Sequence, residues 1–598
     1  MAAADSSPPP AADTSGAVAS SPNSAFDYCV VTASTPELAE LYRQLVKVRQ
    51  ESGLYPERPL FRFYADPATG RVGSGGGTLL ALHELFKEEV GRPAVRNGAL
   101  DEDGLATFFG EKRVLVLHAG GESRRLPCYV PEGKLFAPLA LESSSDRGKA
   151  LPPVVLDLLL SLYASYPWRL GEVIMASGDV IANFDVEVLR RCDRPFERGA
   201  ICGFGKAAGL QQGSKHGVFA FATEEGTEAA ATMRVTDFHQ KSSVEVLRKE
   251  CLVPGTTDTC ALDMGIFTMG LSWCLAFFKF AASTYDQGIS IMEAVEQSKL
   301  YFDFYLEVVI ASLPDQSKED YLRRVRGASK LPSPVLDIIF EKLSGTELEL
   351  RGALVEEAAF LHFGTLREFP LASAEAAARS LRPFYESRAS GACASVDVGS
   401  TAREHVMLAN CTASVRVARK DGDTDVSEPA WVEMCSELTA TLSAGGFHML
   451  VGLSDLHFPA DRSLPAGICL DGRRVAGGAQ IVAAYGVGDT FKPVGSVQDV
   501  IFCGEPMLRW LTERGLGASD VWDEGSEADL WSARLFCAGL PVDALCGYWD
   551  AKSFSRETFT KAERFSLGYL NRCSSALERD SLRAAYLAKP TSAHASDS

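Results

Sequence analysis

The 598-residue sequence has little of what marks secreted, membrane-spanning or zinc-binding proteins. Its fifteen cysteines are scattered singly, without a C-x-x-C pair, so we expect neither a structural zinc site nor a disulfide framework. No lysine or arginine precedes Arg43, which argues against the basic start of a signal or transit peptide. The longest uncharged apolar stretch, 264–278, is too short and too polar for a membrane span. We therefore expect a cytoplasmic protein with reduced cysteines and no membrane partner.

Positive charge is also in deficit, because 59 basic residues face 78 acidic ones and the formal net charge is −19. Such a field repels phosphate backbones, so the composition argues against a nucleic-acid partner. Any site that handles phosphates must therefore be a local cluster of basic side chains on an acidic protein. Hydrophobic residues make up 46% of the chain, which is ordinary for a protein with a large core.

The order of apolar runs along the chain predicts two domains after a disordered Ala/Ser/Pro-rich tail at 1–26. From 27 to 345, strand-like runs such as 60–64 and 113–118 alternate with helical patterns such as 36–51. This alternation predicts an α/β domain with a Rossmann-like, mostly parallel sheet that binds ligands at the carboxyl ends of its strands. Residues 346–598 are β-rich, which favours a parallel β-helix domain closed by C-terminal helices.

The sharpest motif follows the run at 113–118, where the sequence continues as HAGGESRRLP and then, at 131–138, as PEGKLFAP. Paired glycines let a backbone approach a phosphate, the amides that follow can donate to its oxygens, and nearby basic side chains neutralise its charge. The P-loop spacing G-x-x-x-x-G-K-[ST] is absent. A plain turn with solvated arginines is the alternative. The candidate phosphate contacts are Gly120, Gly121, Ser123, Arg124, Arg125 and Lys134.

Further candidates stand at other ends of strand-like runs. The glycine-rich segment 72–79 fits either a nucleotide contact or a tight turn, and its candidate residues are Gly73, Gly75, Gly76 and Thr78. Asp179 follows the strand-like run 172–176 and is placed to hold Mg²⁺, although an Asp in a turn or helix cap is the more ordinary interpretation. Polar residues also end later apolar runs, among them Lys241, Asp263, Gly265 and Asp303.

Taken together, these motifs resemble the signature of fucose-1-phosphate guanylyltransferases, which are sugar-nucleotide pyrophosphorylases. The resemblance rests on HAGG-x-S-x-R-x-P with GK-x-x-x-P, and it extends to other segments between residues 27 and 550. These segments are VGSGGGTL at 72–79, KHGVF at 215–219, LHFGT at 361–365 and DLWSARLF at 529–536.

The resemblance implies a transfer of GMP from GTP to β-L-fucose 1-phosphate, giving GDP-L-fucose and pyrophosphate with Mg²⁺ as cofactor. It implies that Arg125, Lys134 and Asp179 are catalytic and that the two glycine-rich segments bind the nucleotide. Asp179 would hold the metal, with Asp303 as a second ligand. The sugar phosphate would be bound by His216, Lys241, Asp263 and Gly265. Lys241 matches imperfectly, because the related pyrophosphorylases have E-K-P where this chain reads Gln-Lys-Ser.

Two other functions are consistent with the sequence. The chain could be a pyrophosphorylase for another sugar 1-phosphate or nucleotide, or a non-catalytic regulatory subunit of the same fold. Intact Arg125, Lys134 and Asp179 argue against the second alternative. Fucokinase activity, which bifunctional relatives combine with this transfer, is not expected, because the sequence has no further glycine- and serine-rich phosphate loop of the kind that their kinase domain carries. The sequence does not indicate an oligomeric state.

Overall fold

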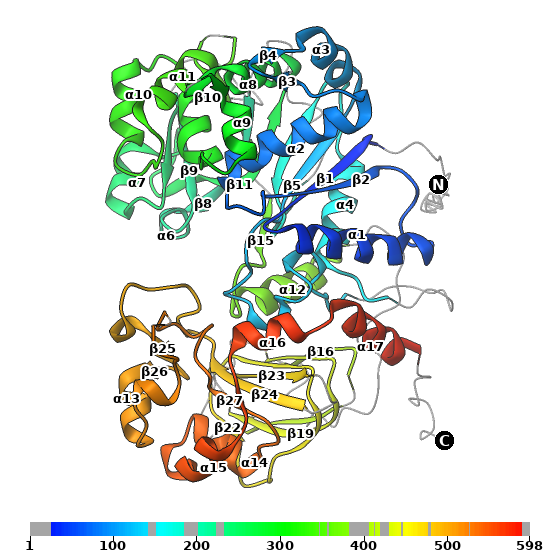
Figure 1. The fold of residues 1–598 in the computed structure, drawn as a ribbon, viewed down its shortest axis with the longest axis vertical. Helices are drawn as coiled ribbons and strands as arrows, with labels where there is room; N and C mark the ends of the chain where they lie inside the picture. The colour runs from blue at the N-terminus through cyan, green and yellow to red at the C-terminus, as the bar shows by residue number, and fades with distance from the viewer. Residues whose placement is uncertain are drawn as a thin grey trace, which may run out of the picture.

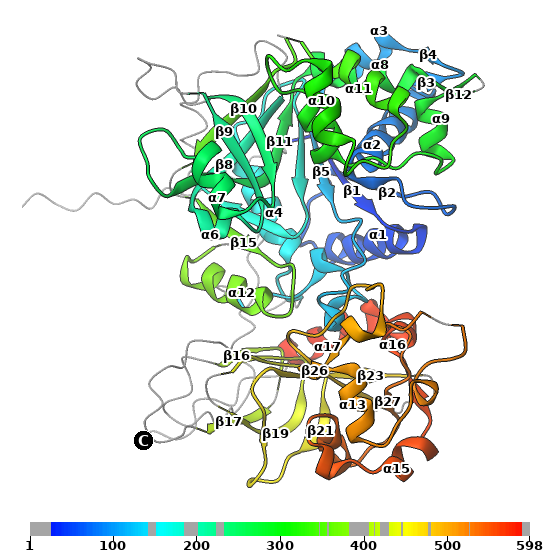
Figure 2. The same cartoon turned by 90° about the vertical axis from the view of Figure 1, so that its left-hand side faces the viewer.

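The computed structural model shows two bodies stacked along the long axis of the molecule (Figure 1). It describes residues 25–588 apart from 142–150, 185–200, 223–232, 287, 346, 356–357, 382–405, 412, 419–429, 444–445, 476–479 and 526. Most of the expected tail, 1–24, lies outside the described residues. The first body contains a nine-stranded sheet with helices on both faces, and the second is β-rich (Figures 1 and 2).

The large sheet begins as the sequence predicts, with parallel strands. The order is β2-β1-β5-β6-β11-β8-β14-β10-β9. The first four strands pair in parallel; they are β1 (Tyr28–Ala33), β2 (Leu60–Ala65), β5 (Val114–His118) and β6 (Val173–Ser177). Successive residues of a strand point to opposite faces of the sheet. Val116 therefore lies in the same buried cluster as Val30, and the next residue, Leu117, lies in the cluster on the other face. Helix α1 (Pro36–Glu51) and helix α2 (Gly73–Val90) pack beside these strands.

The rest of the sheet differs from the predicted, mostly parallel arrangement. Its strands are β8 (Ile201–Gly209), β9 (Gly217–Phe221), β10 (Met233–Gln240), β11 (Thr259–Met269) and β14 (Leu350–Val355). Of the pairs they make, only β14 with β8 is parallel, and the others are antiparallel. The described helices among β8–β11, α6 (Leu210–Gly213) and α7 (Val244–Glu250), are too short to serve as crossovers for parallel pairing.

The first domain also extends past residue 345, where the sequence suggests its end. Strand β14 lies inside the large sheet, and β15 (Ala359–His362) pairs with β7 (Val180–Asn183). Helix α12 (Glu368–Ala378) follows and lies between the two bodies in both views (Figures 1 and 2). A composition-based boundary misses this, because the strands at 350–362 are as apolar as those of the second domain.

The second domain contains two sheets whose strands run mainly parallel. One sheet has the order β16-β18-β20-β23-β24 and the other β17-β19-β21. From β16 to β21 successive strands alternate between the sheets; they are β16 (Val406–Ala409), β17 (Ala413–Ala418), β18 (Ala430–Glu433), β19 (Ser436–Ser443), β20 (His448–Val451) and β21 (Ser454–His457). The short β22 (Ser463–Leu464) pairs with β19 in the second sheet, and β23 (Ile468–Arg474) returns to the first. Only β24 (Gln480–Gly486) is antiparallel to its neighbour. Helices α15 (Arg556–Lys561), α16 (Leu567–Cys573) and α17 (Ala576–Ala588) follow near the end of the described chain.

A buried set of ion pairs joins the two domains. Glu132 of the first domain bonds Arg583 of α17 at 2.8 Å and also contacts Arg579, and Arg583 bonds Glu433 of β18 at 2.8 Å. Glu132, Glu433 and Arg583 are fully buried. Because an unpaired buried charge is costly, these pairs fix how the domains sit together. They also hold the segment that carries Lys134.

Among the described helices, none has both the length and the apolar character needed to cross a bilayer.

Candidate active site

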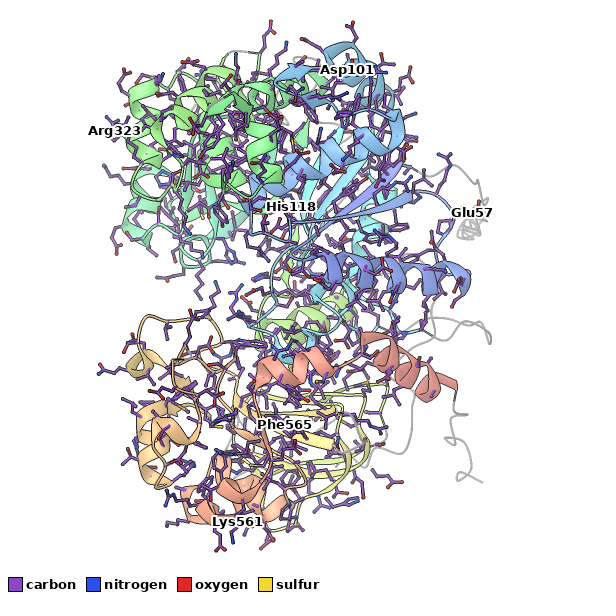
Figure 3. All side chains as sticks on the ribbon, in the orientation of Figure 1. Glu57, Asp101, His118, Arg323, Lys561 and Phe565 are labelled. Atoms are coloured by element: carbon purple, nitrogen blue, oxygen red, sulfur yellow. The ribbon has the colours of Figure 1, made fainter. Side chains whose placement is uncertain are left out.

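The candidate site lies where the parallel strands β5 and β6 end. His118, labelled in Figure 3, is the last residue of β5, and its carbonyl accepts the amide of Gly178 at 3.0 Å. This bond ties the loop after β5 to the loop after β6. The two loops carry the predicted phosphate-binding residues and Asp179. The carboxyl ends of neighbouring parallel strands therefore bring these motifs together, as the sequence predicts for an α/β sheet.

The centre of the site is an ion pair between Lys134 and Asp179. Lys134 Nζ lies 2.6 Å from Asp179 Oδ2, and Ser177 Oγ donates to Asp179 Oδ1 at 2.8 Å. Burial works to raise the pKa of Asp179, but Lys134 and His362 outweigh it and hold that pKa well below its usual range. Asp179 is therefore an anion here, and Lys134 is held beside it.

His362 is a further member of the site, which the sequence reasoning did not assign. Its Nε2 lies 3.7 Å from Asp179 Oδ2, and its Nδ1 lies 3.2 Å from Glu368. Burial would lower the pKa of His362, but the two carboxylates raise it to about 9. His362 ends strand β15, and Phe363 donates its amide to the carbonyl of Asp179 at 2.8 Å. The LHFGT segment carries this histidine, but the local sequence alone does not indicate its chemistry.

Asp263 is a buried carboxylate in the middle of β11. Its Oδ1 accepts the Gly265 amide at 2.8 Å, but burial dominates and raises its pKa to about 7. Asp263 and Asp179 both act on the hydroxyl of Tyr305, whose pKa burial raises well above its usual value. Gly265 adopts φ +68°, and a Cβ there would come within 3.2 Å of Ser177. The predicted sugar-side residues Asp263 and Gly265 therefore reach the same place as Asp179.

Basic side chains gather around this centre. The carbonyl of Arg125 accepts the Leu366 amide at 3.1 Å, and its guanidinium contributes to the low pKa of Glu368. The amide of Lys241 donates to the carbonyl of His216 at 2.9 Å, and the Lys241 side chain is exposed. His216 faces His362 with 6.0 Å between ring centroids. The structure thus brings Arg125, Lys241 and His216 to the site from three segments of the chain.

The paired glycines of the main loop leave room for a ligand. A Cβ added at Gly121 would meet nothing within 4 Å, and one at Gly120 would make only ordinary contacts at 3.7 Å. Ser123 adopts φ +54°, which turns the chain before Arg124. Packing therefore does not explain why glycine stands at position 121, and the open space leaves the backbone accessible to a ligand.

The other glycine-rich segment has a packing explanation. It forms the first turns of α2 rather than a free loop, and the amides of Gly75 and Gly76 donate to the carbonyl of Phe302. A Cβ at Gly73 would meet that carbonyl at 2.2 Å, and one at Gly75 would meet the Phe302 ring at 2.4 Å. Thr78 is fully buried, and its hydroxyl bonds His118 Nε2 at 2.8 Å. These contacts support helix packing, so we carry none of the four residues into the proposed nucleotide contacts.

The contacts of Arg124 and Asp303 differ from those expected for a phosphate ligand and a metal ligand. Arg124 turns to the second domain, where its Nη1 lies 3.7 Å from Asp529 and its guanidinium lies 5.5 Å from the Trp531 ring centroid. Asp303 accepts the amides of Tyr305 and Leu306 at 2.9 Å and the hydroxyl of Ser74 at 2.8 Å. These bonds use both of its oxygens, as in a helix cap. We therefore do not carry Asp303 into a metal site.

The remaining carboxylates fit a magnesium ion that is shared with substrate phosphates. Mg²⁺ usually takes one or two protein carboxylates and completes its shell with phosphates and water. Asp179 offers an ionised carboxylate, and buried Asp263 lies close by without a basic group acting on its pKa. Within the described residues, three potential ligands come within 4.8 Å of one another on α2 and α9 (Ile291–Glu296), not here. A metal held by Asp179 and Asp263 would therefore need further ligands from a bound molecule or from water.

Comparison of the sequence with known proteins identifies a family. Residues 106–539 match the fucose pyrophosphorylase domain. A bifunctional fucokinase/GDP-fucose pyrophosphorylase of Arabidopsis thaliana is 26% identical over 550 residues, covering 86% of this chain and 46% of the relative. A fucose-1-phosphate guanylyltransferase of Homo sapiens is 22% identical over 367 residues, covering 58% and 54%.

A solved mannose-1-phosphate geranyltransferase from Thermus thermophilus aligns with 76% of this chain and 93% of its own, at 12% identity and a TM-score of 0.23. The chain spans about half the length of the curated relatives it matches. The matched domain covers more than half of the 598 residues and contains Lys134, Asp179 and His362. The chain therefore belongs to the fucose pyrophosphorylase family.

Proposed function

We propose that this protein transfers GMP from GTP to β-L-fucose 1-phosphate, giving GDP-L-fucose and pyrophosphate. The observation that carries the proposal is the Lys134–Asp179 pair, which joins the long segment after β5 to the loop after β6 and carries the open glycine loop in the same segment as Lys134. Family membership supports the same substrates, because relatives are named fucose-1-phosphate guanylyltransferase. A regulatory subunit without chemistry would have no need to keep this charged arrangement.

The reaction requires alignment and charge neutralisation more than acid–base chemistry. An oxygen of the sugar phosphate attacks the α-phosphorus of GTP, the new P–O bond forms, and the bond to the bridging oxygen of pyrophosphate breaks. The nucleophile is already ionised, so no general base is needed. Arg125 and Lys134 would hold the phosphates in line and stabilise the charge that builds up in the transition state.

Magnesium is the cofactor that these residues would accept. Asp179 would hold the ion, and the bound ion would neutralise phosphate charge during the displacement. In the structure Lys134 occupies one oxygen of Asp179. When substrates bind, Lys134 can turn from the carboxylate to a phosphate, since both are anionic oxygen acceptors. Lys134 would thus neutralise the Asp179 carboxylate in the free protein and bind a phosphate once the substrates are present.

His216, Lys241, Asp263 and Gly265 are the residues that we propose for the sugar phosphate. Lys241 would bind its phosphate, while Asp263 would accept hydrogen bonds from sugar hydroxyls. We further propose that the second domain is a short parallel β-helix, because its successive strands alternate between two parallel sheets. That architecture gives a rigid platform for the loops that face the first domain.

Exchange of labelled pyrophosphate tests the transfer directly. The protein is incubated with GDP-L-fucose, Mg²⁺ and ³²P-pyrophosphate, and the label is followed into GTP. We expect label in GTP, with release of fucose 1-phosphate in equal amount, and no label when GDP-fucose is omitted. Hydrolysis of GDP-fucose without labelled GTP would contradict the proposed transfer, and so would exchange that proceeds equally with GDP-mannose.

A further inference from the structure

One loop of the second domain is held rigidly toward the candidate site. It follows β24, and it is anchored by Asp489, which accepts the amides of Gly486, Cys503 and Gly504 at 2.7, 2.8 and 3.0 Å. Two residues on, Phe491 is buried and packs edge-on against Tyr485, with 5.5 Å between ring centroids. The backbone that leads into the next residue, Lys492, is therefore fixed.

Trp531 ties this loop to the phosphate loop of the first domain. Its indole N–H donates to the carbonyl of Phe491 at 2.7 Å, and the guanidinium of Arg124 lies 5.5 Å from its ring centroid. Arg125 and Lys492 each follow directly a residue that is held against Trp531. The Trp531 ring thus contacts the residue before Arg125 and the residue before Lys492, and so brings these two chain segments of different domains together.

The side chain of Lys492 is exposed and stands among other cations. Arg125 lowers the pKa of Lys492, burial adds to this, and Lys241 and Lys134 act in the same direction. All three charged groups that shift it are basic. Like charges repel, and the protein carries a formal net charge of −19, so four cations gathered from two domains point to an anionic ligand.

We propose that Lys492 binds a phosphate group of a substrate, and that the second domain thereby supplies part of the active site. The proposal rests on the proposed function and deepens it. Two anionic substrates must lie side by side for the transfer, and each cation between them lowers their mutual repulsion. A lysine fits this task, because its flexible stem lets one charge follow a phosphate as it moves.

The test compares three variants of the full chain with wild type. Lys492→Ala removes the charge, Lys492→Arg keeps it, and Lys552→Ala is a matched control. Lys552 is an exposed lysine of the same domain, near Asp550. Affinities for GTP, fucose 1-phosphate and inorganic pyrophosphate are measured by calorimetry without turnover. Steady-state kinetics and melting temperature are recorded on the same samples.

We expect Lys492→Ala to weaken binding of at least one of these ligands by about tenfold, the usual effect of losing one hydrogen bond to a charged group. A loss for GTP and pyrophosphate would place the lysine on the nucleotide, and a loss for fucose 1-phosphate would place it on the sugar phosphate. Lys492→Arg should retain most of the affinity, and Lys552→Ala all of it. The melting temperature should not change.

Wild-type affinity of Lys492→Ala for all three ligands would overturn the proposal, as would an equal loss in Lys552→Ala. The proposed function fails separately. Suppose that the wild-type protein binds pyrophosphate but exchanges no label into GTP, and that Lys492→Ala no longer binds pyrophosphate. This result would support Lys492 as a phosphate ligand and would contradict the proposed transfer reaction.

Discussion

Lys134 and Asp179 are separated by 45 residues in the sequence, yet Nζ of one lies 2.6 Å from Oδ2 of the other. The pair joins the loop after β5 to the loop after β6. Because the lysine lies so close to a candidate metal ligand, the proposed phosphate binding and the proposed metal binding would use neighbouring atoms. We therefore expect substitutions of the two residues to cause different defects, one in metal binding and one in phosphate binding.

Removing either charge should slow turnover without unfolding the protein. We expect Lys134→Ala and Asp179→Asn each to reduce kcat by about 10²–10³, the scale for one preorganised electrostatic contact. Excess Mg²⁺ or Mn²⁺ should partly restore Asp179→Asn, because the variant keeps the shape but binds the metal weakly. It should not restore Lys134→Ala. Turnover at rising metal concentration separates the two cases, and near wild-type rates in both would contradict the assignment.

Two glycines should respond differently to alanine. At Gly75 a Cβ would lie 2.4 Å from the Phe302 ring, so Gly75→Ala should lower the free energy of unfolding by about 1–3 kcal/mol. At Gly121 nothing lies within 4 Å, so Gly121→Ala should keep wild-type stability and instead raise the KM for GTP. Urea unfolding and steady-state kinetics check both. A Gly121→Ala enzyme with an unchanged KM would remove this residue from the phosphate contacts.

The buried ion pairs between the domains should be costly to break. Glu132→Gln leaves Arg579 and Arg583 short of a partner, so we expect a loss of about 3–5 kcal/mol, as for other buried pairs. Glu557→Gln is the control, because its pair with Lys561 is exposed and such pairs contribute less than about 1 kcal/mol. The urea midpoints of the two variants give the comparison. Similar midpoints would mean that Glu132 does not hold the domains together.

His118 should make stability depend on pH below neutrality. Burial lowers its pKa from 6.5 to about 4, so the folded protein binds this proton less readily than the unfolded chain. The stability from neutral His118 is therefore complete above pH 6.5 and is lost as pH falls toward 4. His118→Gln can keep the bond to Thr78 and cannot titrate.

Between pH 7.5 and 5, wild type should lose on the order of 1–2 kcal/mol more stability than His118→Gln. Free energies of unfolding from urea titrations at each pH provide the measurement. His457→Gln, which changes an exposed histidine, should instead follow wild type. Parallel curves for wild type and His118→Gln would show that His118 does not titrate in this range.

The sequence predicts local elements better than it predicts partners. Helix α1 and strands β2, β5 and β6 lie within a residue or two of their predicted bounds, because each has a clear apolar period and a cap or glycine at its end. Asp179 stands just after the end of β6, as the sequence predicts, whereas Lys134 begins a short 3-10 helix (Lys134–Phe136) well beyond the end of β5. Their contact depends on the parallel pairing of β5 with β6, and a local sequence pattern does not specify which strands pair.

For some other residues the sequence pattern does not give the role, and the reason is physical. His362 and Lys492 reach the site from segments far along the chain, and Lys492 comes from the other domain. Arg124 has the sequence context of a phosphate ligand, but Trp531 and Asp529 hold it. The glycines before Thr78 have the pattern of a phosphate cradle, but Phe302 occupies the space beside them. In each case a long-range contact decides the role.

The central claim is tested most directly by a matrix of four nucleoside triphosphates against several sugar 1-phosphates, including those of fucose, mannose, glucose and arabinose. Pyrophosphate release is followed with wild-type protein and Mg²⁺, and each product is identified by mass. We expect the highest kcat/KM for GTP with β-L-fucose 1-phosphate, with GDP-L-fucose as the product and Asp179→Asn strongly impaired. A different preferred base or sugar, or no pyrophosphate from any pair, would contradict the proposed function.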